Sequence, residues 1–187
     1  MVILAGSMNK SLIYFLIPVS FLFIYFAGGP VIIFASLMVI FDKCFFSRIK
    51  IFHGIEFSTI AVFLVALKYN LVISISFCIF ILFVLTTAIN IFLGDKLVIN
   101  KEFKLIRSVF GLSLTILEVI IINYFKHIDI FLLMLIILIF GHSLYILKGK
   151  LTQTNYVLDY VGVITNILFN LFLVYFFRSF WLLLLTG

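Results

Sequence analysis

Apolar and polar positions are strongly segregated along this chain. Residues 11–41 form a run of thirty-one positions without a charged side chain, interrupted only by Ala27-Gly28-Gly29-Pro30. A helix that crosses a bilayer needs about 20 apolar residues, and about 18 without charge already indicate a span. Four more charge-free blocks follow the first. The pattern therefore predicts a protein whose solvent is lipid.

The residues between the apolar blocks predict seven membrane segments. Pro30 suits the first turn of a helix and Gly28-Gly29 suits a break before it, so we expect a tight turn there. A single kinked span over 11–41 is the alternative, which would leave six segments. The predicted segments are 11–28, 30–46, 52–67, 70–93, 108–125, 129–147 and 157–177. We therefore expect an all-α, polytopic transmembrane helical bundle in a single domain over 1–187, with a core over 30–177 and an added N-terminal segment.

Composition supports the membrane assignment and argues against a nucleic-acid-binding role. Hydrophobic residues make up 66% of the chain and charged residues 11%, whereas soluble domains have about 45–50% and about 25%. The formal net charge of +6 would suit a nucleic acid, but the basic residues are scattered over the loops with no base-stacking platform beside them. The expected partner is therefore the lipid bilayer, and no nucleic acid.

The basic residues are distributed unevenly between the two predicted sides of the membrane. With alternating segments, the side of the N-terminus holds ten Lys and Arg residues, and the other side holds three, Lys68, Lys126 and Arg178. Basic residues of short loops are retained in the cytoplasm. We therefore predict a multi-pass protein of the cell membrane with a cytoplasmic N-terminus. The predicted cytoplasmic loops are 42–51, 94–107 and 148–156.

Polar side chains inside the predicted segments are the candidates for a functional site, because such groups are costly at membrane depth. Glu118 lies near the predicted midplane, about 15 Å from the start of its segment at helical rise. Asn166 and Asn170 stand one turn apart at comparable depth, and His142 lies nearer the cytoplasmic end of its segment. They would form a ligand-binding or proton-carrying site. Alternatively, a protonated Glu118 donates to a backbone carbonyl or to Asn166 and only supports helix packing.

Several kinds of chemistry are missing from the sequence. Paired aspartates at metal-binding spacing, hydrolase and protease motifs, haem-ligand histidine pairs and nucleotide-binding glycine patterns do not occur. Cys44 and Cys78 lack a ligand spacing and are interpreted as small hydrophobic side chains. Glu56 and Lys68 are interpreted as charges at segment ends that reach the headgroups. We therefore expect no catalytic residue, no metal, no cofactor and no enzymatic activity.

The run from Ile51 to Leu93 resembles a pattern in small membrane proteins. A short apolar helix leads into Phe52-His53-Gly54-Ile55-Glu56-Phe57-Ser58-Thr59, a second ends at Leu67-Lys68-Tyr69-Asn70, and a long one follows. The ending Thr165-Asn166-Ile167-Leu168-Phe169-Asn170 is also similar to theirs. The families are the substrate-capture (S-component) proteins of energy-coupling-factor transporters and the cell-shape protein MreD. The resemblance implies a six-helix core and a pocket open to the outer side, although those families usually carry Gly-Pro or Gly-Gly where Lys68-Tyr69-Asn70 stands.

These observations lead to one expected function and two alternatives. We expect a non-enzymatic membrane protein of the transport type, or an accessory membrane subunit, that acts with partner proteins and binds a small molecule. The first alternative is a purely structural subunit of a larger membrane complex, which the short loops and few intramembrane polar groups would also suit. The second is a lipid-modifying enzyme, for which the sequence shows no headgroup site.

Overall fold

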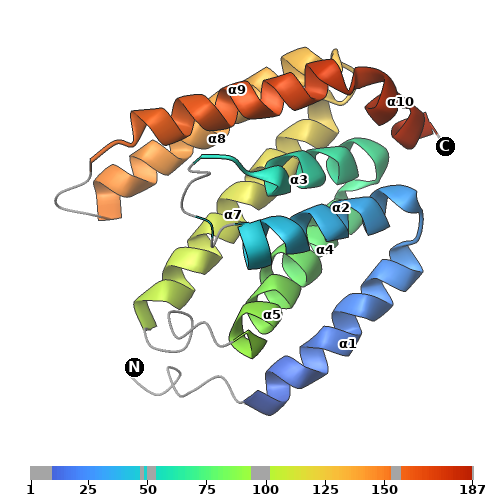
Figure 1. The fold of residues 1–187 in the computed structure, drawn as a ribbon, viewed down its shortest axis with the longest axis vertical. Helices are drawn as coiled ribbons and strands as arrows, with labels where there is room; N and C mark the ends of the chain where they lie inside the picture. Colours follow the sequence, from blue (N-terminus) through green and yellow to red (C-terminus); the bar gives the residue numbers. More distant parts are fainter. Residues whose placement is uncertain (1–9, 47–48, 50–53, 94–101, 153–156, 187) are drawn as a thin grey trace.

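The computed structural model describes residues 10–46, 49, 54–93, 102–152 and 157–186, and within these ranges it is built of helices without strands (Figure 1). The prediction of an all-α protein is therefore confirmed for the described part of the chain. Parts of the predicted loops 42–51, 94–107 and 148–156 lie outside the described residues, as do residues 1–9.

Each of the seven predicted segments contains a helix. The helices are α1 (Lys10–Ala27), α2 (Pro30–Ile40), α3 (Phe57–Lys68), α4 (Leu71–Phe77), α5 (Thr86–Phe92), α7 (Glu102–Phe125), α8 (Ile130–Thr152), α9 (Tyr160–Phe176) and α10 (Arg178–Thr186). The described residues also contain two π-helical segments. The segment η1 (Phe41–Phe45) continues α2, and η3 (Cys78–Leu85) joins α4 to α5 in one continuous helix.

The helix ends differ from the predicted ones where charged residues occur. The predicted loop 94–107 was expected to end at residue 107, but α7 begins at Glu102. Likewise α8 continues through Lys150 to Thr152, into the predicted loop 148–156. A charged residue is disfavoured at the centre of a bilayer but not in a helix that extends beyond it. The charge-free blocks therefore predicted these two helices as shorter than they are.

Two described helices are long and apolar enough to cross a membrane, Leu71–Asn90 and Ile130–Leu147. A third is added if Tyr160–Phe176 and Arg178–Thr186, which meet at an angle of 68°, are counted as one broken span. By contrast, α3 has 12 residues, which at helical rise is about 18 Å, against a hydrocarbon core of about 30 Å. The full number of six or seven crossings therefore stays a prediction.

The break predicted at Gly28-Gly29 separates α1 from α2. Both glycines have positive φ, 63° and 88°, a conformation that costs residues with a Cβ. The Tyr69 hydroxyl donates a hydrogen bond to the Gly28 carbonyl at 2.8 Å, and a Cβ on Gly29 would lie 2.6 Å from that hydroxyl. The chain therefore makes a tight turn here, and the alternative of one kinked helix over 11–41 is wrong.

The core is centred on α3, which is buried on nearly all sides. Residues 60–66 are each at most 5% exposed, and α3 contacts α2, α7, α9 and α10. The outer faces of the surrounding helices present large apolar side chains, such as Phe15, Tyr25 and Phe26 of α1, which are 67%, 80% and 79% exposed. Apolar faces of this extent are not stable in water without a partner, and lipid would cover them.

The helices alternate in direction, so two ends of the bundle can be defined (Figure 1). One end holds η1, the end of α5, and the start of α7 and of α9. The opposite end holds the turn at Gly28-Gly29, the turn between α3 and α4, the turn between α7 and α8, and α10. We call these the η1 end and the α10 end. The charge count predicts that the η1 end faces the cytoplasm.

Candidate functional site

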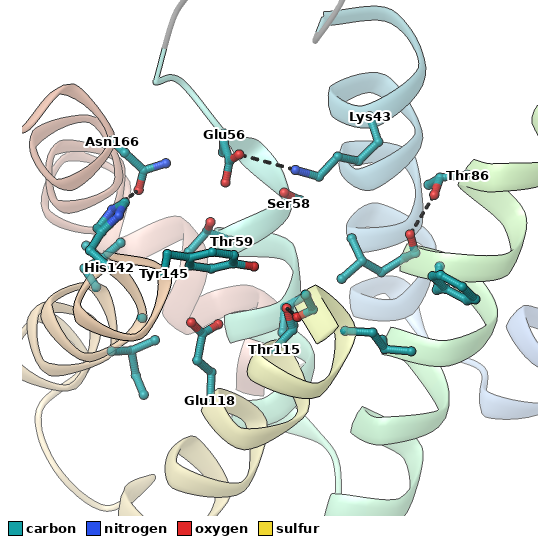
Figure 2. Close-up of a pocket in the computed structure, with 18 of the residues that line it drawn as sticks. Lys43, Glu56, Ser58, Thr59, Thr86, Thr115, Glu118, His142, Tyr145 and Asn166 are labelled. Atoms are coloured by element: carbon teal, nitrogen blue, oxygen red, sulfur yellow. Dashed lines mark hydrogen bonds and ion pairs between the residues drawn. The ribbon is translucent and has the colours of Figure 1, made fainter. Parts of the chain in front are cut away.

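A cavity of about 420 Å³ opens among α3, η3, α5, α7, α8 and α9 near the η1 end (Figure 2). Most of its lining residues are polar, although the surrounding helices are apolar. The lining residues are Lys43, Glu56, Ser58, Thr59, Val62, Leu82, Phe83, Thr86, Thr87, Asn90, Gly111, Leu112, Thr115, Glu118, Ile137, Leu138, Gly141, His142, Tyr145 and Asn166.

Three of the four predicted site residues meet at this cavity. Glu118 of α7, His142 of α8 and Asn166 of α9 all line it. The His142 Nε2 atom lies 3.1 Å from the Asn166 Oδ1 atom, and an amide oxygen only accepts, so the contact is a hydrogen bond when Nε2 carries the proton. The structure therefore brings together residues that the sequence places on three different helices.

The fourth predicted residue, Asn170, lies behind the cavity wall rather than in it. Its side chain is completely buried, and its Nδ2 atom donates to both the backbone oxygen and the Oδ1 atom of Asn166, at 2.9 and 3.2 Å. Asn170 therefore orients Asn166. A direct contact between Asn170 and a ligand, as the prediction allowed, does not fit its position.

The Glu118 carboxylate points into the cavity from α7 (Figure 2). It lies directly against Gly141 of α8, where a Cβ atom would collide with Glu118 Oε1. Within the described ranges, no hydrogen bond or ion pair joins this carboxylate to another residue. The alternative that Glu118 donates to Asn166 is therefore not what the structure shows, because Asn166 contacts His142 and Asn170 instead.

Lys43 and Glu56, from two chain segments, lie at the top of the cavity in Figure 2 and belong to a cluster of charges that also contains Asp42. Lys43 Nζ lies 3.6 Å from Asp42 Oδ2 and 3.5 Å from Glu56 Oε1, and Asp42 also accepts a hydrogen bond of 3.0 Å from the Ser58 backbone nitrogen. Asp42 is 2% exposed. Because this carboxylate accepts from the first turn of α3, it fixes η1 against that helix.

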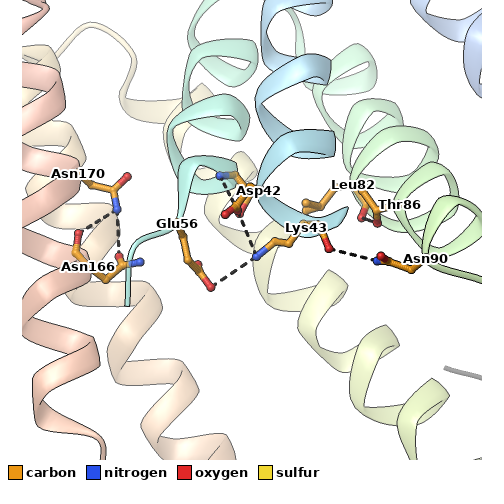
Figure 3. Close-up of polar contacts among 9 residues, drawn as sticks. Asp42, Lys43, Glu56, Leu82, Thr86, Asn90, Asn166 and Asn170 are labelled. Carbon is orange, nitrogen blue, oxygen red and sulfur yellow. Dashed lines mark hydrogen bonds and ion pairs between the residues drawn. The ribbon is translucent and has the colours of Figure 1, made fainter. Parts of the chain in front are cut away.

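This charged cluster continues to α5 (Figure 3). Asn90 Nδ2 donates to the Lys43 backbone oxygen at 3.2 Å, and the Cys44 thiol lies 3.8 Å from the Thr86 backbone oxygen. Reading Glu56 as a charge that only reaches the headgroups missed its ion pair with Lys43. No local signal could have found it, because thirteen positions and a turn separate the two residues.

The π-helical segments η1 and η3 border the cavity. Lys43 belongs to η1, and Leu82 and Phe83 belong to η3. A π-helical turn displaces backbone groups from the regular α-helical pattern and occurs frequently at functional sites. Ser20 of α1 donates to the Phe80 carbonyl of η3 at 3.0 Å. The predicted added segment α1 therefore supports one wall of the site.

No group of three or more metal-ligating side chains occurs in the described part of the chain. Cys44 of η1 and Cys78 of η3 are buried and are not joined by a disulfide. The cavity therefore offers carboxylate, ammonium, imidazole, amide and hydroxyl groups. This set can bind a small polar molecule by hydrogen bonds and charge.

Two predictions from the sequence disagree about the side to which this cavity opens. The cavity is near the η1 end, which the charge count predicts to be cytoplasmic. The resemblance to substrate-capture proteins implies a pocket open to the outer side. The geometry of the cavity is the same in either orientation.

Comparison of the chain with models of protein families, with curated proteins and with solved structures gave no match. We therefore infer the function from the geometry of the site.

Proposed function

We propose that this chain is a polytopic membrane protein of the transport type that binds a small polar solute inside its helical bundle and acts with partner subunits. The proposal follows the S-component-like interpretation in kind, as a non-enzymatic protein that captures a substrate. A volume of about 420 Å³ lies within the range of small-molecule pockets, about 300–1,000 Å³.

The convergence of Glu118, His142 and Asn166 on one cavity carries this proposal. These residues come from three helices, and each is placed by packing or hydrogen bonds of its own. Polar groups inside an apolar bundle cost free energy unless they are satisfied. A bound solute would satisfy them, because it supplies donors to the Glu118 carboxylate.

The cavity also supports a solute of particular chemistry. The Lys43 ammonium is already near two carboxylates, whereas the Glu118 carboxylate has no such partner among the described residues. A solute with an amino group or another strong donor near Glu118 fits this arrangement best. Hydroxyl and amide groups of Thr86, Thr87 and Asn90 line the side of the cavity formed by α5 and suit a polar, uncharged part of the same solute.

The alternative of a purely structural subunit predicts a different interior from the one that is observed. A subunit without a ligand would fill its interior with side chains, since an unfilled polar cavity offers no packing energy. The polar cavity therefore favours capture of a solute. The lipid-modifying alternative would need a nucleophile or a metal beside the carboxylate, and the cavity lining supplies neither in a recognisable arrangement.

Ligand retention in mild detergent tests this function. The protein would be purified, denatured, and searched for released small molecules by mass spectrometry, and its thermal unfolding would be followed with a panel of amines, amino acids and sugars. Glu118→Gln should lower affinity for the active solute about ten-fold or more, since a hydrogen bond to a charged group contributes about 1.5–3 kcal/mol.

Ser113→Ala is the matched control for that experiment. Ser113 is on the same helix as Glu118, but it is exposed and donates to the Val109 carbonyl of its own helix. This variant should bind the solute as the wild type does. Equal affinity in the wild type and Glu118→Gln, or no stabilisation by any solute class, would contradict the proposed function.

A further inference from the structure

A second cavity, of about 520 Å³, lies at the α10 end and gathers three basic residues. It is formed by the end of α3, the turn between α7 and α8, and α10 (Figure 1). The lining residues are Leu67, Lys68, Lys126, Ile128, Asp129, Ile130, Arg178, Leu182 and Leu185. Lys68, Lys126 and Arg178 are the three basic residues that the charge count assigns to this side.

The charge of this lining is not balanced. Asp129 is the one acid among the described residues that line it, and Arg178 Nη2 donates to Asp129 Oδ2 at 2.8 Å. Lys68 Nζ donates to the Leu185 backbone oxygen. Because that oxygen is neutral, this contact does not compensate the positive charge of Lys68. Among the described residues of the lining, three cations and one carboxylate give a formal charge of +2. Such a site favours an anion.

Aromatic packing holds α10 in place together with the contacts that Lys68 and Arg178 make. Trp181 is 4% exposed and donates from Nε1 to the Leu173 carbonyl at 2.9 Å. The Phe34 ring packs against Phe180 and Trp181, at centroid distances of 5.8 and 6.1 Å. These aromatic contacts hold α10 across the ends of α2 and α3. Helix α10 therefore has an apolar anchorage besides the contacts of Lys68 and Arg178, and those two contacts do not account for the third basic residue at this cavity, Lys126.

We propose that this cavity binds a phosphate group, carried by an anionic lipid headgroup or by a soluble phosphate. Arg binds phosphate oxygens through its planar guanidinium, and Lys binds them as a point charge. Basic pockets between membrane helices on the cytoplasmic or matrix side bind anionic headgroups, and a headgroup at the α10 end offers the same phosphate chemistry. Aliphatic side chains of Leu67, Leu182 and Leu185 lie beside the cations, so the same cavity accommodates the apolar part of a lipid.

Two variants that remove one positive charge each test the site. Lys126→Gln changes an exposed residue and leaves the contacts of Lys68 and Arg178 intact. Lys150→Gln makes the same charge change in the last turn of α8, at the η1 end. Both variants should unfold at the wild-type temperature in detergent. Lys126→Arg keeps the charge and should behave as the wild type in every binding measurement.

The lipid source is tested by native mass spectrometry of the full chain in micelles with equal amounts of phosphatidylglycerol and phosphatidylcholine. The wild type should retain phosphatidylglycerol preferentially. Lys126→Gln should weaken that preference about five-fold, the loss expected for one basic residue at a membrane surface. Lys150→Gln should leave it unchanged.

The soluble source is tested with inorganic phosphate as the probe, in detergent without anionic lipid. Trp181 is the one tryptophan of the sequence and lies on α10, so its fluorescence reports on this end of the bundle. A saturable change with phosphate, absent with chloride at equal ionic strength and about five-fold weaker in Lys126→Gln, would identify a soluble phosphate.

The outcomes separate clearly. A lipid preference that depends on Lys126 assigns the site to a headgroup, and a phosphate response that depends on Lys126 assigns it to a soluble anion. Absence of both overturns the proposal, as does an equal loss in Lys126→Gln and Lys150→Gln, which would show only a general effect of charge. This site is independent of the cavity that contains Glu118, so either proposal can fail without the other.

Discussion

The Oδ1 atom of Asn166 lies 3.1 Å from His142 Nε2 and 3.2 Å from Asn170 Nδ2. One amide oxygen of α9 therefore contacts both the neighbouring helix α8 and the next turn of α9. Because Asn170 is fully buried and Asn166 lines the cavity, the two asparagines have different roles. Asn170 sets the position of the amide, and Asn166 presents it to the cavity.

Replacement of Asn170 by leucine should therefore disturb the site indirectly. We expect Asn170→Leu to lower the free energy of unfolding by about 1–2 kcal/mol, through loss of its hydrogen bonds to Asn166, and to weaken solute retention less than Glu118→Gln does. Chemical denaturation in mild detergent measures the first effect. Asn123→Leu is the control, because Asn123 donates only within α7, to the Val119 carbonyl. An undisturbed Asn170→Leu variant would contradict the orienting role.

Gly141 should tolerate no side chain while Glu118 keeps its position. A Cβ on Gly141 would collide with the Glu118 carboxylate, which is the far end of a flexible side chain beside the open cavity. Gly141→Ala should therefore displace the carboxylate and reduce solute affinity, while the free energy of unfolding changes by less than about 1 kcal/mol, because alanine is about 0.5–1 kcal/mol better than glycine inside a helix. Ser143→Ala provides the control on an exposed position of the same helix. If Gly141→Ala bound solute like the wild type, the position of Glu118 against Gly141 would not matter for binding, and this prediction would be wrong.

Ser20 and Ser36 are both buried but differ in hydrogen bonding, so replacement by alanine should affect stability differently at the two positions. Ser20 is fully buried and donates to the Phe80 carbonyl of η3, so Ser20→Ala should lower the free energy of unfolding by about 0.6–2 kcal/mol. Ser36 is 3% exposed, and its hydroxyl oxygen finds no partner in the described ranges. Ser36→Ala should therefore be neutral or raise that free energy by up to about 1 kcal/mol. The measurement is the difference in the free energy of unfolding between the two variants. If Ser36→Ala were less stable than Ser20→Ala, the assigned hydrogen bonding of these serines would be wrong.

Asp42 and Asp129 form a second matched pair. Each carboxylate lies near a cation, at 3.6 Å from Lys43 Nζ and 2.8 Å from Arg178 Nη2, but the Asp42 side chain is 2% exposed and the Asp129 side chain 46%. Asp42→Asn should cost about 1–3 kcal/mol, because a buried charged hydrogen bond to Ser58 is weakened. Asp129→Asn should cost about 0–1 kcal/mol, as exposed ion pairs do. Unfolding in detergent at low and high salt distinguishes them, since salt screens mainly the exposed pair.

The candidate site could be predicted only in part, because some of its residues are recognisable from their position in the sequence and others are not. Glu118, His142 and Asn166 were found because a polar side chain inside an apolar segment is conspicuous in the sequence. Lys43 and Glu56 were not, because charges at segment ends are common and the sequence does not show which of them meet. Asn170 was placed in the site with Asn166 because i, i+4 spacing defines a shared helix face, but it does not show which of the two reaches the cavity.

The sequence by itself determined the helical class, the positions of the helices and the turn at Gly28-Gly29. These follow from local properties, namely apolar runs, charge and the conformational freedom of glycine. The tertiary structure alone decided that α3 is central, that Lys43 pairs with Glu56, and that Lys68, Lys126 and Arg178 share one cavity. Helices with apolar residues all round have no periodic face that specifies a neighbour, so their packing depends on shape complementarity between whole helices, which no local pattern records.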